Sequence, residues 1–135
     1  MTREKRTILL IEDDTDLRDS LIDILEDEYF ILTASDGSTA LETLEKDGQP
    51  DLIILDMMMP RMNGFEFLRE FREVSEPECP ILLISAFREV AQLAQVFGLP
   101  YLLKPLRGDQ LRATIKKLLL PIHDPEPGPE SKQTA

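Results

Sequence analysis

Hydrophobic and polar positions along this chain follow two alternating patterns, and the alternation repeats five times. Short apolar runs, typical of strands buried on both faces, are each followed by a stretch in which apolar residues recur at helical spacing. The apolar runs cover residues 7–11, 29–34, 52–55, 80–84 and 101–103. The helical stripes that follow them consist of Leu17, Leu21, Ile24 and Leu25; Ala40, Leu41 and Leu44; Phe65, Leu68 and Phe71; Val90, Leu93, Ala94 and Phe97; and Leu111, Ile115, Leu118 and Leu119.

Five successive strand–helix units predict an α/β fold with a doubly wound, five-stranded parallel sheet. Parallel strands joined by helices require right-handed crossovers, and a closed barrel would need about eight such units. We expect the strand order 2-1-3-4-5, in which strands one and three lie side by side where their carboxyl ends part. Asp14 or Thr15 is placed to cap the first helix, and Asp36 to cap the second.

We expect one domain over residues 1–120, followed by a disordered tail or linker over residues 121–135. The tail is rich in Pro and Glu and shows no hydrophobic period. Such a segment buries too little apolar surface to offset the entropy lost on ordering. His123 lies in this tail and is assigned no metal-binding or catalytic role.

Composition and charge indicate a globular, acidic protein. Of the 135 residues, 42% are hydrophobic and 30% are charged, and the formal net charge is −11. An acidic surface repels phosphate backbones, so we expect no direct binding to nucleic acid. The same acidity suits a site for a divalent cation.

The lone cysteine and the lengths of the apolar runs exclude further classes. Cys79 alone forms neither a disulfide nor a cysteine-based zinc site within the chain, and an inert thiol is expected. No run approaches the ~20 apolar residues of a membrane span, and no signal peptide is visible. We therefore expect a cytoplasmic protein with no membrane partner.

Polar residues stand at the predicted carboxyl ends of four strands. They are Glu12 and Asp13 after the first strand, Asp56 after the third, Ser85 after the fourth and Lys104 after the fifth. In an open parallel sheet these ends share one edge, where ligands bind. Three carboxylates brought together repel one another, and a hard divalent cation relieves the repulsion. Oxygen ligands with no His or Cys nearby favour Mg²⁺ over zinc.

This set of groups suits phosphoryl transfer to a carboxylate. With a cation bound, an oxygen of Asp56 can attack a phosphoryl group as a nucleophile. The metal, the Lys104 ammonium and the Ser85 hydroxyl would then neutralise the charge of the transferred group. A simpler alternative stays open, in which Lys104 forms a structural salt bridge with one acid and Ser85 only caps a helix.

Four short motifs resemble those of one family. They are LLIEDD at the first strand end, LIILDMMMPRMNG with its Asp-x₃-Pro-x₃-Gly spacing, LLISA and YLLKP, in this order. Over about residues 7–120 the chain resembles the receiver (response-regulator) domain of two-component phosphorelays, which has a flavodoxin-like fold. No single motif is decisive, but four in the same order are highly specific.

The resemblance implies roles around a metal ion. Asp56 corresponds to the phosphoacceptor and Asp13 to the acid that binds Mg²⁺ directly. Glu12 corresponds to the acid that acts mainly through metal-bound water. Met58 would offer its backbone carbonyl, not its side chain, to the metal.

The resemblance also implies roles around the phosphoryl group. Ser85 corresponds to the switch hydroxyl, Tyr101 to the aromatic switch residue and Lys104 to the lysine that contacts the phosphate. The Lys104–Pro105 peptide bond is expected to be cis, an accessible state for a bond that precedes proline.

The implied function is a phosphorylation-dependent switch with Mg²⁺ as its cofactor. A sensor histidine kinase or a histidine phosphotransfer protein would donate the phosphoryl group to Asp56. The product would alter the face formed by the fourth helix, fifth strand and fifth helix, toward a downstream protein target or a self-dimer. Such a domain catalyses only its own phosphorylation and dephosphorylation, so it is not otherwise an enzyme.

Other functions are weighed against this one. A phosphorylation-independent interaction module stays open, although the intact acid cluster, Ser85 and Lys104 argue against it. A phosphohydrolase would need a second acid two residues after the nucleophile, where this chain has Met58. A nucleotide-binding flavodoxin-like protein would need a Gly-rich loop after the first strand, which is missing.

The chain departs from the family pattern between its fourth strand and Tyr101. This stretch is shorter than usual, and Leu99-Pro100 stands where small or acidic residues are common. The fourth helix or its flanking loops must therefore be trimmed or repacked. Met58 and Phe87 each follow a site residue by two positions, and our hypothesis is that they shield an acyl phosphate from water.

Overall fold

The structure is a computed structural model that describes residues 5–58, 63–74 and 79–120. These residues form the strands β1 (Arg6–Ile11), β2 (Tyr29–Ala34), β3 (Leu52–Asp56), β4 (Ile81–Ser85) and β5 (Tyr101–Leu103). Each strand precedes one helix: α1 (Thr15–Leu25), α2 (Gly37–Asp47), α3 (Gly64–Val74), α4 (Val90–Phe97) and α5 (Gly108–Leu118). The predicted turn at Pro60 and the tail with His123 lie outside the described residues.

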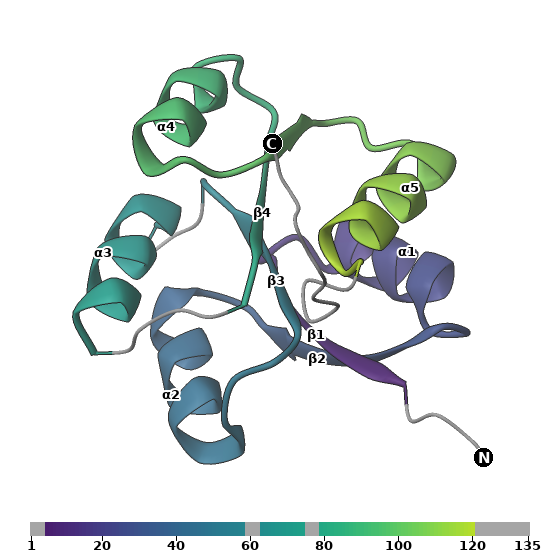
Figure 1. Ribbon diagram of the computed structural model, residues 1–135, viewed down its shortest axis with the longest axis horizontal. Coiled ribbons are helices and arrows are strands. Elements are labelled where there is room, and N and C mark those ends of the chain that lie inside the picture. Colours follow the sequence, from purple (N-terminus) through teal and green to yellow (C-terminus); the bar gives the residue numbers. More distant parts are fainter. Residues whose placement is uncertain (1–4, 59–62, 75–78, 121–135) are drawn as a thin grey trace, which may run out of the picture.

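The sheet has the predicted order β2-β1-β3-β4-β5, and neighbouring strands are parallel. Helices α1 and α5 cover one face, and α2, α3 and α4 cover the other (Figure 1). The register pairs Ile11 with Leu55 and Asp56 with Ile84, so the central strands end at nearly the same level. The fold class and strand order predicted from the sequence are confirmed.

Consecutive residues of the central strands pack into different cores, because side chains alternate between the two faces of a sheet. Leu9 and Ile53 pack with α2, α3 and α4, whereas Leu10 and Ile54 pack with α1 and α5. All four are fully buried. Burial on both faces explains the continuous apolar runs, and it leaves the strand ends as the place for polar side chains.

Side chains at the helix starts define where each connection turns. Asp14, rather than Thr15, caps α1, because its carboxylate accepts two backbone N–H bonds of the first turn at 3.0 and 3.3 Å. Asp36 accepts one such bond at 2.8 Å at the start of α2. A reciprocal pair between Asn63 and Glu66, with bonds of 3.1 and 2.9 Å, caps α3. The sequence patterns had not predicted this third cap.

The trimmed fourth helix is short and attached to α3. It has 8 residues, against 11 in each of the other described helices, and it ends at Gly98 in the left-handed conformation. Phe97 meets Phe65 of α3 edge to face, with ring centroids 5.7 Å apart. Arg72 of α3 donates a 3.3 Å hydrogen bond to the Phe97 carbonyl and lies over its ring.

Cys79 is partly buried beside the core that α2, α3 and α4 cover. Burial raises the pKa of its thiol to about 11. The thiol therefore stays protonated near neutral pH, in keeping with the inert cysteine expected from the sequence.

Gly64, the last residue of the Asp-x₃-Pro-x₃-Gly spacing, lies where α3 begins against the end of β3. A Cβ atom at this position would stand 2.6 Å from Met57 Sδ and 2.7 Å from Met57 Cα. The Gly64 N–H also donates a 3.1 Å hydrogen bond to the Met57 carbonyl. Any larger residue would therefore displace the segment that directly follows Asp56.

We predict that Gly64→Ala lowers the free energy of unfolding by about 1–3 kcal/mol, because the added methyl group overpacks against backbone. Gly108→Ala is the matched control, since a Cβ there meets its nearest atoms at 3.6 to 3.8 Å. We expect this control to be unchanged or stabilised by up to about 1 kcal/mol. Urea unfolding measures both, and equal stability of the two variants would contradict the prediction.

Candidate functional site

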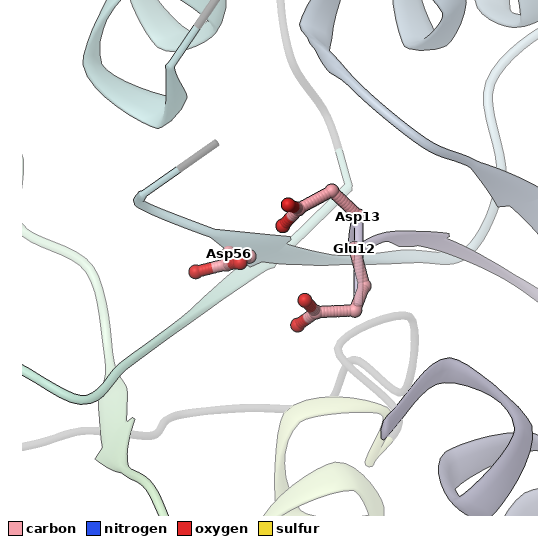
Figure 2. A group of neighbouring side chains, drawn as sticks. All are labelled: Glu12, Asp13 and Asp56. Atoms are coloured by element: carbon pink, nitrogen blue, oxygen red, sulfur yellow. The ribbon is translucent and has the colours of Figure 1, made fainter. Parts of the chain in front are cut away.

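The carboxyl ends of the strands bring together the polar residues singled out in the sequence. Glu12 and Asp13 follow β1, and Asp56 is the last residue of β3, the strand beside it. Ser85 ends β4, and its carbonyl accepts a 2.8 Å hydrogen bond from the Lys104 N–H after β5. Figure 2 shows that the side chains of Glu12 and Asp13 extend in opposite directions from the end of β1 and that both carboxyl groups turn to the side where Asp56 lies.

The three acids form one compact cluster. Each offers a carboxylate oxygen, and these oxygens lie within 4.8 Å of one another. Glu12 and Asp56 are buried, with exposed fractions of 0% and 2%, whereas Asp13 is exposed. The cluster therefore consists of two buried acids, Glu12 and Asp56, and one acid, Asp13, that is exposed to solvent.

Lys104 faces both buried acids. Its Nζ lies 3.3 Å from Glu12 Oε1 and 3.5 Å from Asp56 Oδ2. One ammonium thus pairs with two carboxylates, and a third, Asp13, belongs to the same cluster. Lys104 therefore pairs with two acids, rather than with the single acid of the simpler salt-bridge alternative.

Burial raises the proton affinity of the two inner acids. The pKa of Glu12 is raised to about 7, mainly by burial and further by the neighbouring Asp56 charge. A hydrogen bond from the Asp14 N–H, 3.0 Å from Glu12 Oε2, and the Lys104 charge act in the opposite direction. Burial also raises the pKa of Asp56, against the lowering effects of the Met58 N–H and Lys104.

The donor set of this cluster fits Mg²⁺. Its ligand atoms are carboxylate oxygens, the hard donors that Mg²⁺ prefers. Glu12 Oε1 is buried and has no hydrogen-bond partner among the described residues, since its contact with Lys104 is an ion pair without hydrogen-bond geometry. A cation would supply the partner that this oxygen lacks and would relieve the repulsion that favours a bound proton.

The side chains of Asp56 and Ser85 each accept a hydrogen bond from the backbone N–H of the residue two positions later in the chain. The Met58 N–H donates to Asp56 Oδ1 at 3.1 Å, and the Phe87 N–H donates to Ser85 Oγ at 3.0 Å. Asp56 therefore has one oxygen toward the Met58 backbone and the other toward Lys104. Ser85 is buried at the end of the neighbouring strand β4.

Tyr101 stands apart from the acid cluster. It begins β5 opposite Leu83, whereas Leu103 is the residue opposite Ser85. Its side chain is 40% exposed. The structure thus brings together Glu12, Asp13, Asp56, Ser85 and Lys104, with Met58 beside them, but leaves Tyr101 at a distance along the strand. The predicted cis peptide bond between Lys104 and Pro105 is present.

The sequence patterns did not identify Arg18 as part of the site. Its Nη1 donates a 2.9 Å hydrogen bond to the Glu12 carbonyl, and the Glu12 N–H donates to the Ala34 carbonyl at 3.0 Å. These bonds anchor the backbone that carries two of the acids. The available signal was a cation one helical turn after the cap residue Asp14, on the helix that follows them.

Residues 8–116 match the family model described as the response regulator receiver domain. The chain belongs to this family. The transcriptional regulatory protein CiaR of Streptococcus pneumoniae is 37% identical over 115 residues. The match covers 83% of this chain and 50% of CiaR. The sensor histidine kinase TmoS of Ectopseudomonas mendocina is 35% identical over 116 residues, which cover 83% of this chain and 12% of TmoS.

Solved structures agree with this assignment. The response regulator TrrA of Thermotoga maritima, in complex with Mg²⁺-BeF, superposes with a TM-score of 0.75 at 32% identity, covering 84% of this chain and 99% of TrrA. The receiver domain spans about half the length of several curated regulators that it matches. None of its described helices is long and apolar enough to cross a membrane.

We predict opposite shifts of the Glu12 pKa in two variants of the metal-free protein. Asp56→Asn removes a negative neighbour and lowers the pKa below about 7, whereas Lys104→Met removes a positive neighbour and raises it above about 7. Carboxyl carbon NMR across a pH titration, with a chelator present, measures both shifts. Lys116→Met is the control, because Lys116 pairs with Glu28 at 3.7 Å instead. Shifts of the same sign in both variants would refute this electrostatic description.

Proposed function

We propose that Asp56 accepts a phosphoryl group and that the phosphorylated domain acts as a signalling switch. The observation that carries the proposal is the placement of Asp56 Oδ2 3.5 Å from Lys104 Nζ within a buried acid cluster. A carboxylate in this position is oriented by the Met58 N–H, and the Lys104 ammonium stands ready to stabilise added negative charge. Membership of the response regulator receiver family supports the switch over a phosphorylation-independent interaction module.

The cofactor in this proposal is Mg²⁺. Glu12, Asp13 and Asp56 would hold it, together with the backbone carbonyl of Met58. When bound, the cation would neutralise part of the charge of an incoming phosphoryl group. The complex of the relative TrrA with Mg²⁺-BeF supports the same ion in this domain.

The transfer itself is a substitution at phosphorus. An oxygen of Asp56 forms a bond to the phosphorus atom while the bond between phosphorus and the donor's leaving atom breaks. The Lys104 ammonium and the Ser85 hydroxyl contact the transferred oxygens. Because Met58 occupies the position where a hydrolase would carry an acid, the domain performs only its own phosphorylation and slow dephosphorylation.

The donor in this proposal is the phosphohistidine of a sensor histidine kinase or of a histidine phosphotransfer protein. The output is a protein target or a second copy, bound by the face that α4, β5 and α5 form. Exposed apolar side chains support this face, since Val96, Tyr101 and Leu103 are 78%, 40% and 38% exposed. Tyr101 lies on that face rather than in the acid cluster, as a residue that reports the switch to a partner would.

The first test is chemical phosphorylation. Incubation with acetyl phosphate and Mg²⁺, followed by intact-mass measurement, is expected to give one phosphate adduct. Asp56→Asn and removal of Mg²⁺ by a chelator are each expected to abolish it. Asp47→Asn, a change at an exposed acid at the end of α2, is the control and is expected to keep the adduct. An adduct that survives in Asp56→Asn would overturn the assignment.

The second test concerns the lifetime of the adduct. Met58 and Phe87 are 56% and 52% exposed and belong to one apolar cavity wall beside Ser85. We predict that replacing both with serine speeds dephosphorylation, because water reaches the acyl phosphate more easily. The decay of the adduct after removal of donor measures the rate, with Phe30→Ser as an exposed-aromatic control. An unchanged rate would remove the shielding role.

A further inference from the structure

A cavity of about 240 Å³ opens beside Ser85, between the ends of β3 and β4 and the helices that follow them. Its walls include the apolar side chains of Met58, Phe65, Phe87 and Leu93. A water molecule takes about 30 Å³ of liquid volume, so the cavity has room for a group of several carbon atoms. The transfer proposed for Asp56 does not by itself require such a space.

The cavity adjoins the acid cluster, because Met58 and Ser85 line it and two backbone hydrogen bonds link its wall to site residues. Met58 donates its N–H to Asp56 Oδ1, and Phe87 donates its N–H to Ser85 Oγ. The backbones of Met58 and Phe87 are thereby held at defined positions relative to Asp56 and Ser85. Both side chains are more than half exposed, so they stand at the solvent side of the site.

We propose that this cavity is a subsite for the leaving group of the phosphoryl donor and that it favours donors whose leaving group is apolar. The inference rests on the proposed role of Asp56. In an in-line substitution the leaving group departs on the side opposite the attacking oxygen. Asp56 is buried at the end of β3, so that side is the solvent side of the site, where Met58 and Phe87 stand.

The charge around the cavity selects the class of leaving group. Glu89 lies in its wall, and the three acids lie nearby at the ends of β1 and β3. A leaving group with a further negative charge would be repelled, whereas a hydrocarbon chain or a neutral ring gains by burying apolar surface. With an acyl phosphate, the carboxylate leaves with the electron pair of the broken bond and needs no proton.

The test compares acetyl phosphate with butyryl phosphate. Their leaving groups have nearly equal acidity and differ by two methylene groups, so the comparison isolates apolar contact. Each fully buried methylene favours binding about fourfold. In a cavity open to solvent we expect butyryl phosphate to label the protein roughly three- to tenfold faster, as a second-order rate constant from initial adduct formation with Mg²⁺.

Variants assign the preference to this cavity. Phe65→Ser and Leu93→Ser each remove one apolar wall and are expected to bring the butyryl-to-acetyl ratio close to one. Far-UV circular dichroism and urea unfolding report whether each variant is folded, so that a change in the ratio is assigned to the lost wall. Phe30→Ser, an exposed phenylalanine on β2 outside the cavity, is the matched control and should keep the wild-type ratio.

Each result decides between the two proposals. A wild-type ratio near one, or a high ratio that persists in both wall variants, overturns the leaving-group subsite and leaves Asp56 as phosphoacceptor. Labelling by neither donor overturns the role of Asp56 and the subsite with it. A ratio that falls in both wall variants and stays high in Phe30→Ser supports the subsite.

Discussion

Burial of both faces of the central strands is the constraint on which the acid cluster depends, because the three carboxylates at the strand ends repel one another. Carboxylate oxygens within 4.8 Å of one another stay together only if the surrounding structure is stable without them. The two cores supply that stability, because they bury both faces of β1 and β3. The three negative charges therefore lie at the edge of the sheet where the strands end, and a cation or a phosphoryl donor can reach them there.

The parallel sheet explains how residues far apart in the chain meet at that edge. Each strand ends with its carboxyl terminus on the same side, so one polar residue per strand is sufficient to build the cluster. The order of the strands places the acids of β1 and β3 side by side, with Ser85 and Lys104 following along the sheet. The hydrogen bond from the Lys104 N–H to the Ser85 carbonyl then fixes the backbone from which the Lys104 ammonium reaches Glu12 and Asp56.

The segment that follows Asp56 packs closely against the start of α3. Gly64 lets α3 approach the segment after Asp56, and the Asn63–Glu66 pair holds that helix start in place. The exposed apolar side chains of Met58 and Phe87 stand beside Asp56 and Ser85 on the solvent side of the site. These features belong to the part of the chain that matches the response regulator receiver family. The short α4 is attached to α3 through Phe97.

The sequence by itself determined the five strand–helix units, their parallel order and the five polar residues at the strand ends. These depend on hydrophobic period and on chain connectivity, both of which are written along the chain. Only the tertiary structure decided how strongly Glu12 holds a proton, that Arg18 anchors its backbone, that Tyr101 lies away from the acids, and that an apolar cavity adjoins Ser85. Burial, distance and cavity shape arise from packing between distant segments, so no local pattern encodes them.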